Sequence, residues 1–416
     1  MKWATYTMQE LINEISMGPF GSDIKKSVYT NSGVPVLNGS NLQGFTLKEN
    51  TFGYVSEEKA DSLKKCNAHR GDIIVTHRGT LGQIVYIPNN SLFERYVISQ
   101  SQFRFNLKPE LARAEFIVYY FHTREGQHKI LSNASQVGVP ALARATTTFR
   151  QLEVKVPPLP VQDKIVGILS SLDSKIENNN KINANLEAQA QALFKSWFVD
   201  FTPFKDQPFV DSELGPIPQG WKVGKLGDYC EVKSGYAFKS SWWTNKGYKI
   251  IKIKNISENG DINLNDCSCV LPENCDKAKN FIANTGDIVI AMTGATIGKF
   301  NIIPKIDEKF YINQRVGKFF LGEKPIEKVP YIYCFLKQEN ISTQIIQKGQ
   351  GSAQPNISGA DIESIPMLTP MSIILKYNKM CQPLFEKILS NRLESKKLSA
   401  LRDTLLPKLM SGEIKL

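Results

Sequence analysis

Short runs in which apolar and polar residues alternate, separated by glycine and asparagine turns, occupy much of the chain. Between residues 248 and 254 the alternation places two isoleucines on one face and Lys252 and Lys254 on the other, which is the pattern of a half-buried strand. Longer apolar patterns predict helices around residues 114–130 and 329–347. Together these patterns predict mixed α/β domains of ordinary size.

A different pattern follows each of these regions: apolar residues recur alternately four and three positions apart, which predicts a heptad seam on a long helix. Prolines precede both seams, at positions 157, 158 and 160 and at positions 366 and 370. Because the residue before a proline resists helical geometry, these prolines predict sharp domain exits. A helix of nearly forty residues would be roughly 55 Å long. The seams comprise Ile165, Leu169, Leu172, Ile176, Asn179, Asn183, Leu186, Ala190, Leu193 and Trp197 in the first helix, and Tyr377, Cys381, Leu384, Ile388, Asn391, Ser395, Leu398, Arg402, Leu405 and Leu409 in the second.

The two seams share a polar centre flanked by apolar residues. Asn179 and Asn183 interrupt the first seam, and Asn391 and Ser395 interrupt the second. In an antiparallel pair the centres would face each other, and hydrogen bonds between them would fix the register because a slip leaves each polar group against apolar neighbours. A simply solvated polar centre is the equally open alternative. Pro383 predicts a kink or an interruption early in the second helix.

The sequence contains an internal repeat. Residues 71–75 (Gly-Asp-Ile-Ile-Val) recur as residues 286–290 (Gly-Asp-Ile-Val-Ile), and a glycine-rich turn follows each copy. The offset between the copies drifts from 218 residues at Trp3 and Trp221 to 215 residues at the repeated glycine, which indicates a duplicated domain with small insertions. Further matches are Asn31-Ser32-Gly33 with Asn245-Lys246-Gly247, Ser99-Gln100 with Asn313-Gln314, and Gly138-Val139-Pro140 with Ala353-Gln354-Pro355.

Composition and charge favour a globular protein with a polyanionic partner. The 416 residues suit two or three domains, and 42% of them are hydrophobic, which is enough for a buried core. The formal charge of +11 and the pI of about 9.1 suit DNA or RNA, although many soluble proteins are equally basic. We find no signal-peptide pattern, no apolar run of membrane-spanning length and no disulfide-like cysteine spacing. We therefore expect a cytoplasmic protein.

The sequence offers no recognised catalytic or metal-binding motif. Cys267, Cys269 and Cys275 cluster, but they lack C-x-x-C spacing and a nearby histidine, so we expect no zinc. A phosphate loop, a dinucleotide-binding G-x-G-x-x-G and an amino-methyltransferase Asn/Asp-Pro-Pro-Tyr/Phe segment are all missing. Asp72 and Asp287 follow glycines at strand starts, where we expect turn capping. The repeat therefore predicts a binding module without a catalytic centre.

Four segments resemble conserved regions in the specificity subunits of type I restriction-modification systems. Residues 157–165 (Pro-Pro-Leu-Pro-Val-Gln-Asp-Lys-Ile) resemble the entry into that family's central helix, and residues 192–201 (Ala-Leu-Phe-Lys-Ser-Trp-Phe-Val-Asp-Phe) resemble its end. Residues 212–221 (Ser-Glu-Leu-Gly-Pro-Ile-Pro-Gln-Gly-Trp) resemble the entry into the second recognition domain. Residues 405–414 (Leu-Leu-Pro-Lys-Leu-Met-Ser-Gly-Glu-Ile) resemble the family's C-terminus. Together with the repeat, the resemblance spans the whole chain.

The resemblance implies a duplicated α/β (α+β) fold, in which two target recognition domains are joined by two long antiparallel coiled-coil helices. In this chain the recognition domains would be residues 1–158 and 221–368, the helices residues 159–200 and 369–416, and the linker residues 201–220. Each domain would read one half of a bipartite site in double-stranded DNA. The helices would act as a ruler that separates the two halves by a non-specific spacer.

The resemblance also implies partners that supply the chemistry. Two modification (methyltransferase) subunits would dock on the helices, and restriction (endonuclease and translocase) subunits would join them to cut DNA. This chain would itself bind no cofactor and no metal. S-adenosylmethionine would belong to the methyltransferase, and ATP and magnesium would belong to the restriction subunit. No contact with a membrane is implied, and the target sequence does not carry over because the family's recognition domains vary widely.

Polar residues on the repeated turns are the candidate DNA contacts, because arginine reads guanine, asparagine and glutamine read adenine, and lysine and hydroxyl groups hold phosphates. Glycines in the loops 135–140 and 348–356 would let backbone amides approach phosphates. For Trp242 and Trp243 we expect core packing rather than stacking on bases. The candidates are His77, Arg78, Thr80, Gln100, Gln102, Arg104 and Arg144 in the first copy, and Lys252, Lys254, Thr293, Thr296, Lys299, Asn313, Gln314, Arg315, Lys348, Gln350, Gln354 and Asn356 in the second.

Two other functions can be weighed against this one. A stand-alone bivalent DNA-binding regulator would use the heptad seam only for internal packing, and it would bind its site without a modification subunit. A single-chain restriction enzyme would need catalytic motifs, and their absence from the sequence counts heavily against it.

Overall fold

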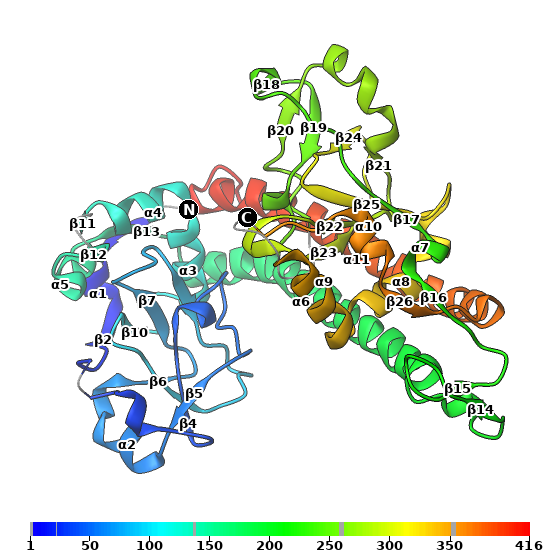
Figure 1. The fold of residues 1–416 in the computed structure, drawn as a ribbon. Helices are drawn as coiled ribbons and strands as arrows, with labels where there is room; N and C mark the ends of the chain where they lie inside the picture. Colours follow the sequence, from blue (N-terminus) through cyan, green and yellow to red (C-terminus); the bar gives the residue numbers. More distant parts are fainter. Residues whose placement is uncertain (1–2, 22, 136–138, 258–261, 351–354) are drawn as a thin grey trace. The chain divides into compact units, whose positions relative to one another are not determined.

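The chain folds into two compact units. The computed structural model describes residues 3–21, 23–135, 139–257, 262–350 and 355–416. Unit 1 comprises Met1–Ser174 together with Leu398–Leu416, and unit 2 comprises Lys175–Lys397 (Figure 1). The two ends of the chain therefore belong to the same unit.

Unit 1 contains two larger sheets, in which most neighbouring strands are antiparallel. A four-stranded sheet has the order β2-β10-β7-β8, and a five-stranded sheet has the order β3-β5-β4-β9-β6. Two further strand pairs, β1-β13 and β11-β12, complete the described sheets of this unit. The strands are β1 Ala4–Thr7, β2 Ile12–Met17, β3 Tyr29–Thr30, β4 Val34–Val36, β5 Gly53–Val55, β6 Asn67–His69, β7 Ile73–Thr76, β8 Ile84–Tyr86, β9 Arg95–Val97, β10 Gln102–Leu107, β11 Ala134–Ser135, β12 Ala141–Leu142 and β13 Glu153–Val156.

Unit 2 repeats the strand order of the two larger sheets, and its pair β16-β26 corresponds to β1-β13. Its four-stranded sheet has the order β17-β25-β22-β23, and its five-stranded sheet has the order β18-β20-β19-β24-β21. In both five-stranded sheets the middle strand pairs in parallel, β4 with β9 and β19 with β24. The strands are β14 Phe209–Val210, β15 Ile217–Pro218, β16 Val223–Lys225, β17 Glu231–Ser234, β18 Trp243–Thr244, β19 Tyr248–Ile251, β20 Ser268–Val270, β21 Ile282–Ala283, β22 Ile288–Ala291, β23 Phe300–Ile302, β24 Phe310–Ile312, β25 Val316–Phe320 and β26 Pro366–Leu368.

The strand predicted over residues 248–254 is shorter than expected. It ends at Ile251, and residues 253–255 form a 3₁₀ turn. The side chain of Asn255 causes this ending, because its Oδ1 accepts a 2.9 Å hydrogen bond from the backbone N–H of Lys252 and its Nδ2 donates one of 2.8 Å to the carbonyl oxygen of Asn263. Lys252 and Lys254 therefore do not line a strand, and that prediction was wrong.

Each helix predicted after the sheets is in fact a pair of helices. In unit 1 these are α3 Ala114–His122 and α4 Arg124–Leu131, and in unit 2 they are α8 Val329–Leu336 and α9 Glu339–Gly349. Thr123 separates the first pair because its hydroxyl accepts a 3.0 Å hydrogen bond from the N–H of Gly126, as an N-cap residue does. The shorter helices are α1 Met8–Leu11, α2 Glu57–Ser62, α5 Ala145–Arg150, α7 Leu226–Tyr229 and α10 Gly359–Glu363. The 3₁₀ turns are η1 Lys26–Val28, η2 Gly39–Asn41, η3 Lys64–Cys66, η4 Thr202–Phe204, η5 Ser240–Trp242, η6 Ile253–Asn255, η7 Pro272–Asn274, η8 Asp276–Phe281, η9 Gly294–Thr296 and η10 Pro325–Glu327.

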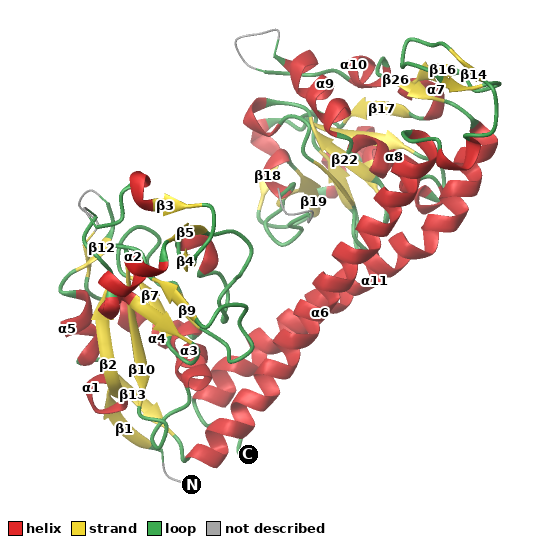
Figure 2. Cartoon of the chain, turned by 90° about the horizontal axis from the view of Figure 1, so that it is seen from below, coloured by secondary structure: helices red, strands yellow, loops and turns green. Residues whose placement is uncertain are grey.

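Two helices of 40 residues each, α6 Leu159–Phe198 and α11 Met371–Met410, follow the two copies of the repeat. Helix α11 runs through Pro383 without an interruption, contrary to one of the two outcomes predicted for that residue. The proline removes one helical hydrogen bond, but Cys381 and Phe385 on either side are buried in the core of unit 2, and this packing holds the helix together. Within unit 2 the two helices lie side by side (Figure 2).

Apolar packing joins the helices to the domains within each unit. In unit 1, Leu169 of α6 and Leu409 of α11 share a core with Phe103, Phe105 and other buried side chains of the four-stranded sheet. In unit 2, Phe194 of α6 and Tyr377 of α11 share a core with the strands and with α8. Full burial of one such side chain stabilises a fold by roughly 1.5–3 kcal/mol, so the helices are part of the domain cores.

Candidate DNA interface

Three segments of unit 1 meet at the turn that follows β7. The backbone N–H of His77 donates to the carbonyl oxygen of Ser101 at 2.9 Å, and the N–H of Gly79 donates to that of Pro140 at 2.8 Å. The N–H of Leu142 in turn donates to the carbonyl oxygen of His77 at 2.8 Å. We call residues 77–80, 99–101 and 139–142 the turn cluster of unit 1.

The same hydrogen bonds recur in unit 2. The N–H of Met292 donates to the carbonyl oxygen of Arg315 at 3.0 Å, and the N–H of Gly294 donates to that of Pro355 at 3.0 Å. The N–H of Ile357 donates to the carbonyl oxygen of Met292 at 3.0 Å. Residues 292–296, 313–315 and 355–357 therefore form the turn cluster of unit 2. The repeat thus preserves the backbone framework of this surface as well as the strands below it.

A buried ion pair lies in each of the two four-stranded sheets. Arg104 in unit 1 faces Asp72 at 3.3 Å, and Lys318 in unit 2 faces Asp287 at 2.6 Å. Each cation also donates to a backbone carbonyl oxygen, that of Lys65 at 3.2 Å and that of Ile282 at 2.8 Å. The pairs are structural, because all four side chains are almost completely buried.

The two aspartates also cap turns, as predicted. Asp72 accepts a 3.0 Å hydrogen bond from the N–H of His69, and Asp287 accepts one of 2.7 Å from the N–H of Asn284. Burial raises the pKa of both carboxyl groups, while the facing cation and the backbone N–H oppose that rise.

Two of the residues selected as candidate DNA contacts in unit 1 are buried and cannot contact DNA. Arg104 is 5% exposed and its guanidinium group is paired with Asp72 and Glu14, so it does not reach a ligand. The side chain of Gln102 is 1% exposed, and its Oε1 accepts a 2.9 Å hydrogen bond from the N–H of Ser99. Both residues support the turn cluster from the interior of unit 1. The sequence does not distinguish them from Gln100, which is exposed on the same turn.

The other candidates in unit 1 lie at the surface. Arg78, Thr80, Gln100 and Arg144 are exposed, and Arg144 has a left-handed backbone conformation with φ of 47° at the start of α5. His77 is half-buried, and its Nε2 lies 3.2 Å from the carbonyl oxygen of Gln100. Burial lowers the pKa of His77, which favours the neutral ring at neutral pH.

Most of the candidates in unit 2 are also accessible, although they differ in exposure. Asn313 is buried, with 8% of its surface exposed, and its Oδ1 accepts from the N–H of Arg315 at 3.4 Å, so it shapes the turn. Lys348 is exposed and donates to the hydroxyl of Ser364 at 3.1 Å, while Gln354 lies outside the described residues. Gln314, Arg315, Gln350 and Asn356 are exposed, and Thr293, Thr296 and Lys299 are half-buried.

Lys252 and Lys254 follow β19, whose last residue, Ile251, accepts a 3.0 Å hydrogen bond from the N–H of Asn313 in the turn cluster. The ammonium group of Lys252 lies 3.4 Å from the ring centre of Trp243 and donates to the hydroxyl of Ser268 at 2.9 Å. Burial lowers the pKa of Lys252. Lys254 is exposed and pairs with Asp266 at 2.9 Å. Trp242 and Trp243 pack against a small apolar core, so the expectation of core packing is confirmed.

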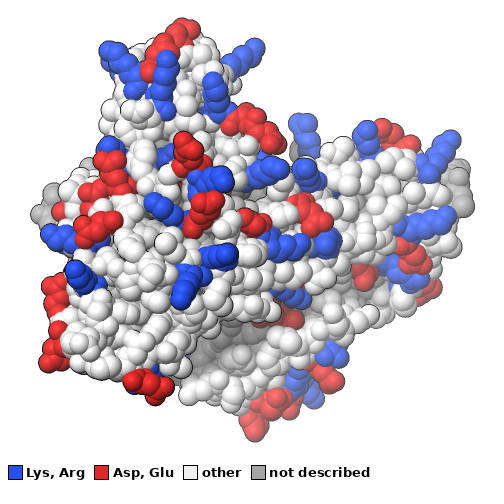
Figure 3. Space-filling view, turned by 90° about the vertical axis from the view of Figure 1, so that its right-hand side faces the viewer, with Lys and Arg blue, Asp and Glu red and all other residues white. Residues whose placement is uncertain are grey.

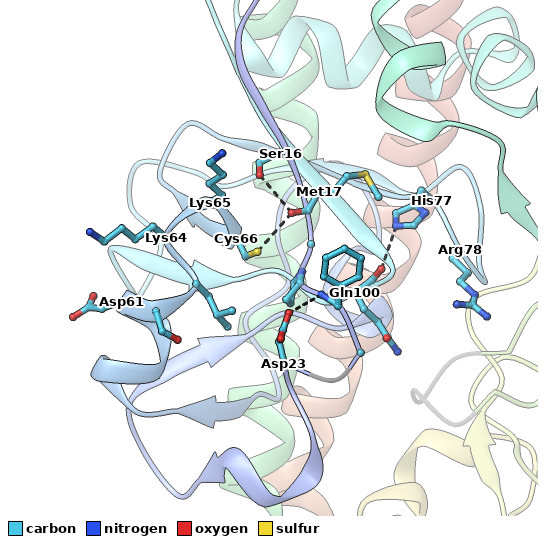
Figure 4. Close-up of a pocket in the computed structure, with 16 residues that line it drawn as sticks. Ser16, Met17, Asp23, Asp61, Lys64, Lys65, Cys66, His77, Arg78 and Gln100 are labelled. Carbon is cyan, nitrogen blue, oxygen red and sulfur yellow. Dashed lines mark hydrogen bonds between the residues drawn. The ribbon is translucent and has the colours of Figure 1, made fainter.

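An open hollow of about 890 Å³ adjoins the turn cluster of unit 1 (Figure 4). Its lining includes His77, Arg78 and Gln100, together with three residues that we did not select from the sequence: Phe20, Lys64 and Lys65. In Figure 4 the side chains of Lys64 and Lys65 point outward from the 3₁₀ turn η3 that carries both. The available signal was the Gly-Pro-Phe-Gly turn at residues 18–21, which places an aromatic residue between two glycines.

Charge on the surface is mixed. On the face that Figure 3 shows, basic and acidic side chains are intermingled, so the formal excess of +11 is not gathered there into one basic band. Within the described residues, no group of three or more His, Cys, Asp or Glu side chains is arranged to hold a metal ion. In the same part of the chain, no helix combines the length and the apolar content needed to cross a bilayer.

The polar centres of the helix pair meet within unit 2. Nδ2 of Asn391 donates to Oδ1 of Asn183 at 2.9 Å, and Nδ2 of Asn179 donates to the hydroxyl of Ser395 at 3.3 Å. Asn179 also donates to a carboxylate oxygen of Glu394 at 2.9 Å. The ascending positions in α6 pair with descending positions in α11, so the two segments are antiparallel. That these bonds fix the register stays a prediction.

A second polar network joins the helices in unit 1. Nη1 of Arg402 lies 2.6 Å from Oδ1 of Asp173, whose other oxygen accepts a 2.6 Å hydrogen bond from the hydroxyl of Tyr119. The guanidinium group of Arg402 also lies 4.8 Å from the ring centre of Phe45. Arg402, a charged residue of the second heptad seam, thus belongs to a polar network that links α6, α11 and α3.

Comparison with known proteins agrees with these features. The family described as "Type I restriction modification DNA specificity domain" matches residues 2–188 and 218–376, one match for each copy of the repeat. The MjaIX specificity subunit of a type I restriction enzyme from Methanocaldococcus jannaschii is 29% identical over 368 residues, which cover 86% of this chain and 81% of that protein. The HindI specificity subunit from Haemophilus influenzae is 24% identical over 480 residues, with 99% of both chains covered.

The fold comparison agrees as well. The crystal structure of a type I S subunit from M. genitalium superposes with a TM-score of 0.60 at 18% identity, and the match covers 98% of this chain and 96% of that one. At this identity the likeness concerns the fold alone, and it confirms the predicted duplicated mixed domains with long helices. The chain belongs to the family of type I restriction-modification specificity subunits, which supply two recognition domains and leave catalysis to other subunits of the complex.

Proposed function

We propose that this chain reads a bipartite DNA target, with the turn cluster of each unit contacting one half-site and the two long helices setting the length of the spacer. The observation that carries the proposal is the duplicated backbone framework. The bond from Gly79 to Pro140 and the bond from Gly294 to Pro355 hold equivalent loops in equivalent places. Two copies of one reading surface suit a target with two separate halves.

The exposed side chains of the turn clusters suit the edges of bases. Gln100 and Gln314 occupy matching positions of the repeat, and both are exposed. A glutamine amide can donate to and accept from adenine in the major groove, and arginine, represented here by Arg78 and Arg315, can donate twice to guanine. The positive formal charge supports attraction to the phosphates, which supplies affinity without sequence preference.

We propose that the helices also dock two modification subunits. Both helices expose large apolar side chains, of which Leu375 of α11 is the most prominent with 65% of its surface accessible. Exposed apolar side chains of this size favour contact with another protein. The others on the helices are Ile182, Met371, Met380 and Leu401. In this proposal restriction subunits join the complex, S-adenosylmethionine binds to the modification subunits, and ATP and magnesium bind to the restriction subunits.

Methylome sequencing of a host that carries this chain and its modification subunit tests the proposal. We expect one methylated motif with two specific halves and a spacer of constant length. Gln100→Ala and Gln314→Ala should each relax the preference in a different half and leave the other half unchanged, because each removes a base contact worth about 1–3 kcal/mol. A single uninterrupted motif, or relaxation of the same half by both variants, would contradict the proposal.

Co-purification tests the docking part separately. The full-length chain should retain the modification subunit, and Leu375→Asp should weaken that association because it places a charge in the apolar contact. The control is Lys376→Asp, which changes the neighbouring exposed residue of α11. Tight binding of the isolated chain to its DNA site, with no retention of a modification subunit, would favour a stand-alone regulator instead.

A further inference from the structure

Phe20 is the most exposed large apolar side chain described in the molecule, with 83% of its surface accessible. It lies at the hollow next to the turn cluster of unit 1, in the turn formed by residues 18–21. An aromatic ring in water forgoes the gain that burial would bring, so its place at a candidate binding surface calls for a ligand.

The backbone of this turn is held in place. The N–H of Gly18 donates to the carbonyl oxygen of Gln102 at 2.8 Å, and a Cβ atom on Gly18 would overlap the carbonyl oxygen of Ser99. The N–H of Phe20 donates to a carboxylate oxygen of Asp23 at 3.0 Å, and the N–H of Asp23 donates back to the carbonyl oxygen of Phe20 at 2.9 Å. The ring is therefore presented to solvent by a fixed turn that is anchored on the end of β10.

The surroundings of the ring suit a polyanion with flat apolar surfaces. Lys64, Lys65 and Arg78 contribute positive charge to the lining of the hollow. The carboxylates there are already engaged: that of Asp61 pairs with Arg95 at 2.6 Å, and that of Asp23 binds the backbone of the turn. Double-stranded DNA offers both the negative charge of its phosphates and apolar groups on base edges in the major groove, such as the thymine methyl.

The ring also lies close to a candidate base-reading group. A Cβ atom on Gly21 would overlap Oε1 of Gln100, so the amide of Gln100 packs directly on the turn that carries Phe20. Glycine at position 21 leaves the space that this amide occupies. The polar and the apolar group are thus presented together on the same surface of unit 1.

Unit 2 lacks this feature. Gly235 is the counterpart of Gly18, because its N–H donates to the carbonyl oxygen of Val316 at 2.9 Å and a Cβ atom there would overlap the carbonyl oxygen of Ile312. Two residues further along, unit 2 has Ala237, and the following Phe238 is turned into the core with 7% of its surface exposed. The exposed aromatic ring at this position is thus specific to unit 1, since the nearby Tyr236 of unit 2 is half-buried and packs against Phe238.

We propose that Phe20 makes an apolar contact with the bases of the half-site read by unit 1, beside the base contacted by Gln100, and that unit 2 reads its half-site without an aromatic contact. This inference rests on the proposed function, since it assigns a specificity-determining residue to one of the two reading surfaces. It predicts that the two half-sites are recognised by different chemistry despite the common fold.

The test uses the complex of the full-length chain with its modification subunits and a duplex that carries the motif found by methylome sequencing. Phe20→Ala should weaken binding to this duplex about tenfold, because the apolar contact of the ring with a base edge in the groove would be lost. In a set of duplexes with single base-pair changes, the variant should lose discrimination at one or two positions of the half that Gln100→Ala also affects. Phe20→Leu keeps an apolar side chain, so its losses of affinity and of base-pair discrimination should be smaller than those of the alanine variant. The control is Leu92→Ala, at another exposed residue of unit 1 outside the hollow, and it should change neither affinity nor discrimination.

Two outcomes would overturn the inference. If Phe20→Ala binds the duplex and all its changed versions as the wild-type complex does, the ring makes no contact with bases. If the variant instead loses its modification subunits while the remaining complexes keep normal discrimination, the ring is a protein contact. The proposed function is judged separately by the bipartite motif and by the glutamine variants. Circular dichroism of each variant shows whether it is folded, and Phe20→Leu keeps the test decisive if the alanine variant is not.

Discussion

Asn391 and Asn183 form a hydrogen bond across the helix pair, from Nδ2 of Asn391 to Oδ1 of Asn183 at 2.9 Å. Asn391 is 1% exposed, and so is Asn179, which donates the neighbouring hydrogen bond to Ser395. A buried amide that loses its partner bears the cost of desolvation without compensation, so a shift of α11 along α6 is unfavourable. The apolar seam residues Leu186 of α6 and Ile388 of α11 adjoin the asparagine pair on the same side and offer no polar partner.

Replacing Asn391 should destabilise unit 2. Asn391→Ala removes the donor and leaves the amide of Asn183 partly buried without it, so we expect the free energy of unfolding to fall by about 1–3 kcal/mol. Urea denaturation followed by circular dichroism measures this change. The control is Asn180→Ala, a change at an exposed asparagine of α6, which should stay within about 0.5 kcal/mol of the wild type.

A double-mutant cycle with Asn183→Leu and Asn391→Leu separates the bond from its surroundings. Each single leucine leaves one unpaired amide, whereas the double variant restores a matched apolar pair, so the two changes should be non-additive by more than about 0.5 kcal/mol. Additive effects would show that the two amides do not depend on each other and that their hydrogen bond does not fix the register.

Replacing Lys318 should be more costly than replacing a surface lysine. Lys318→Met leaves the buried carboxyl of Asp287 without its cation, and removal of one partner from a buried pair costs about 3–5 kcal/mol. Asp287→Leu combined with Lys318→Met should recover much of this loss because no uncompensated charge remains. Lys233→Met, at the exposed residue opposite Lys318 on β17, is the matched control and should have little effect. Equal losses from both single lysine variants, measured by thermal denaturation, would contradict this account.

The stability of unit 1 should decline in mild acid because of His122. Burial lowers the pKa of this ring, and the charge of Arg402 adds to that effect, whereas its hydrogen bond to the carbonyl oxygen of Ile84 at 2.8 Å and the charge of Asp173 oppose it. The folded pKa is thus below the unfolded value of about 6.5. The contribution of His122 is complete above pH 6.5 and is lost as the pH falls towards the folded pKa, since the unfolded chain binds the proton first.

Hydrogen exchange of α3 at several pH values between 5 and 8 measures this dependence within unit 1. His122→Gln has no group that titrates in this range, so its protection should vary less with pH than that of the wild type. An identical pH dependence in both proteins would assign the effect to another group, for which His77 is the next candidate because burial lowers its pKa too.

The sequence was sufficient for the architecture because the architecture rests on periodicity and repetition. The heptad spacing of residues such as Ile165 and Leu169 predicted long helices, and the repeated Gly-Asp segment predicted duplicated domains; both are features of the structure. Element ends were predicted less well because they depend on single polar side chains. Asn255 ends a strand and Thr123 divides a helix through hydrogen bonds to the backbone, which no apolar period reveals.

The candidate site was harder to predict because exposure is a tertiary property. Gln100 and Gln102 are two residues apart and chemically identical, yet one faces solvent and the other accepts a bond from the N–H of Ser99 in the interior. Arg104 has the hydrogen-bond donors of a base-reading residue, but its guanidinium group pairs with Asp72 and Glu14. Phe20 was overlooked for the opposite reason, since aromatic residues are usually buried and the Gly-Pro-Phe-Gly turn around it was the only local signal of exposure.

Lengthening the helix pair should lengthen the DNA spacer. Seven residues inserted in α6 between Leu172 and Leu186, with seven more in α11 between Ile388 and Arg402, preserve the heptad seam and the facing polar centre. The insertion adds about 10.5 Å at 1.5 Å per residue, which corresponds to about three base pairs at 3.4 Å each. Methylome sequencing should therefore show both half-sites unchanged and a spacer longer by about three base pairs.

Methylation of the new site should be less efficient than methylation of the original one. Three base pairs turn the DNA by about 100°, given 10–10.5 base pairs per turn, whereas a heptad is two nearly whole turns of the helices and does not rotate the units by the same amount. Torsion in the DNA would have to make up the difference. Insertion of seven residues in α6 alone is the control: it displaces Asn183 from Asn391 and should abolish methylation. A changed half-site sequence with matched insertions would show that the helices do more than set a distance.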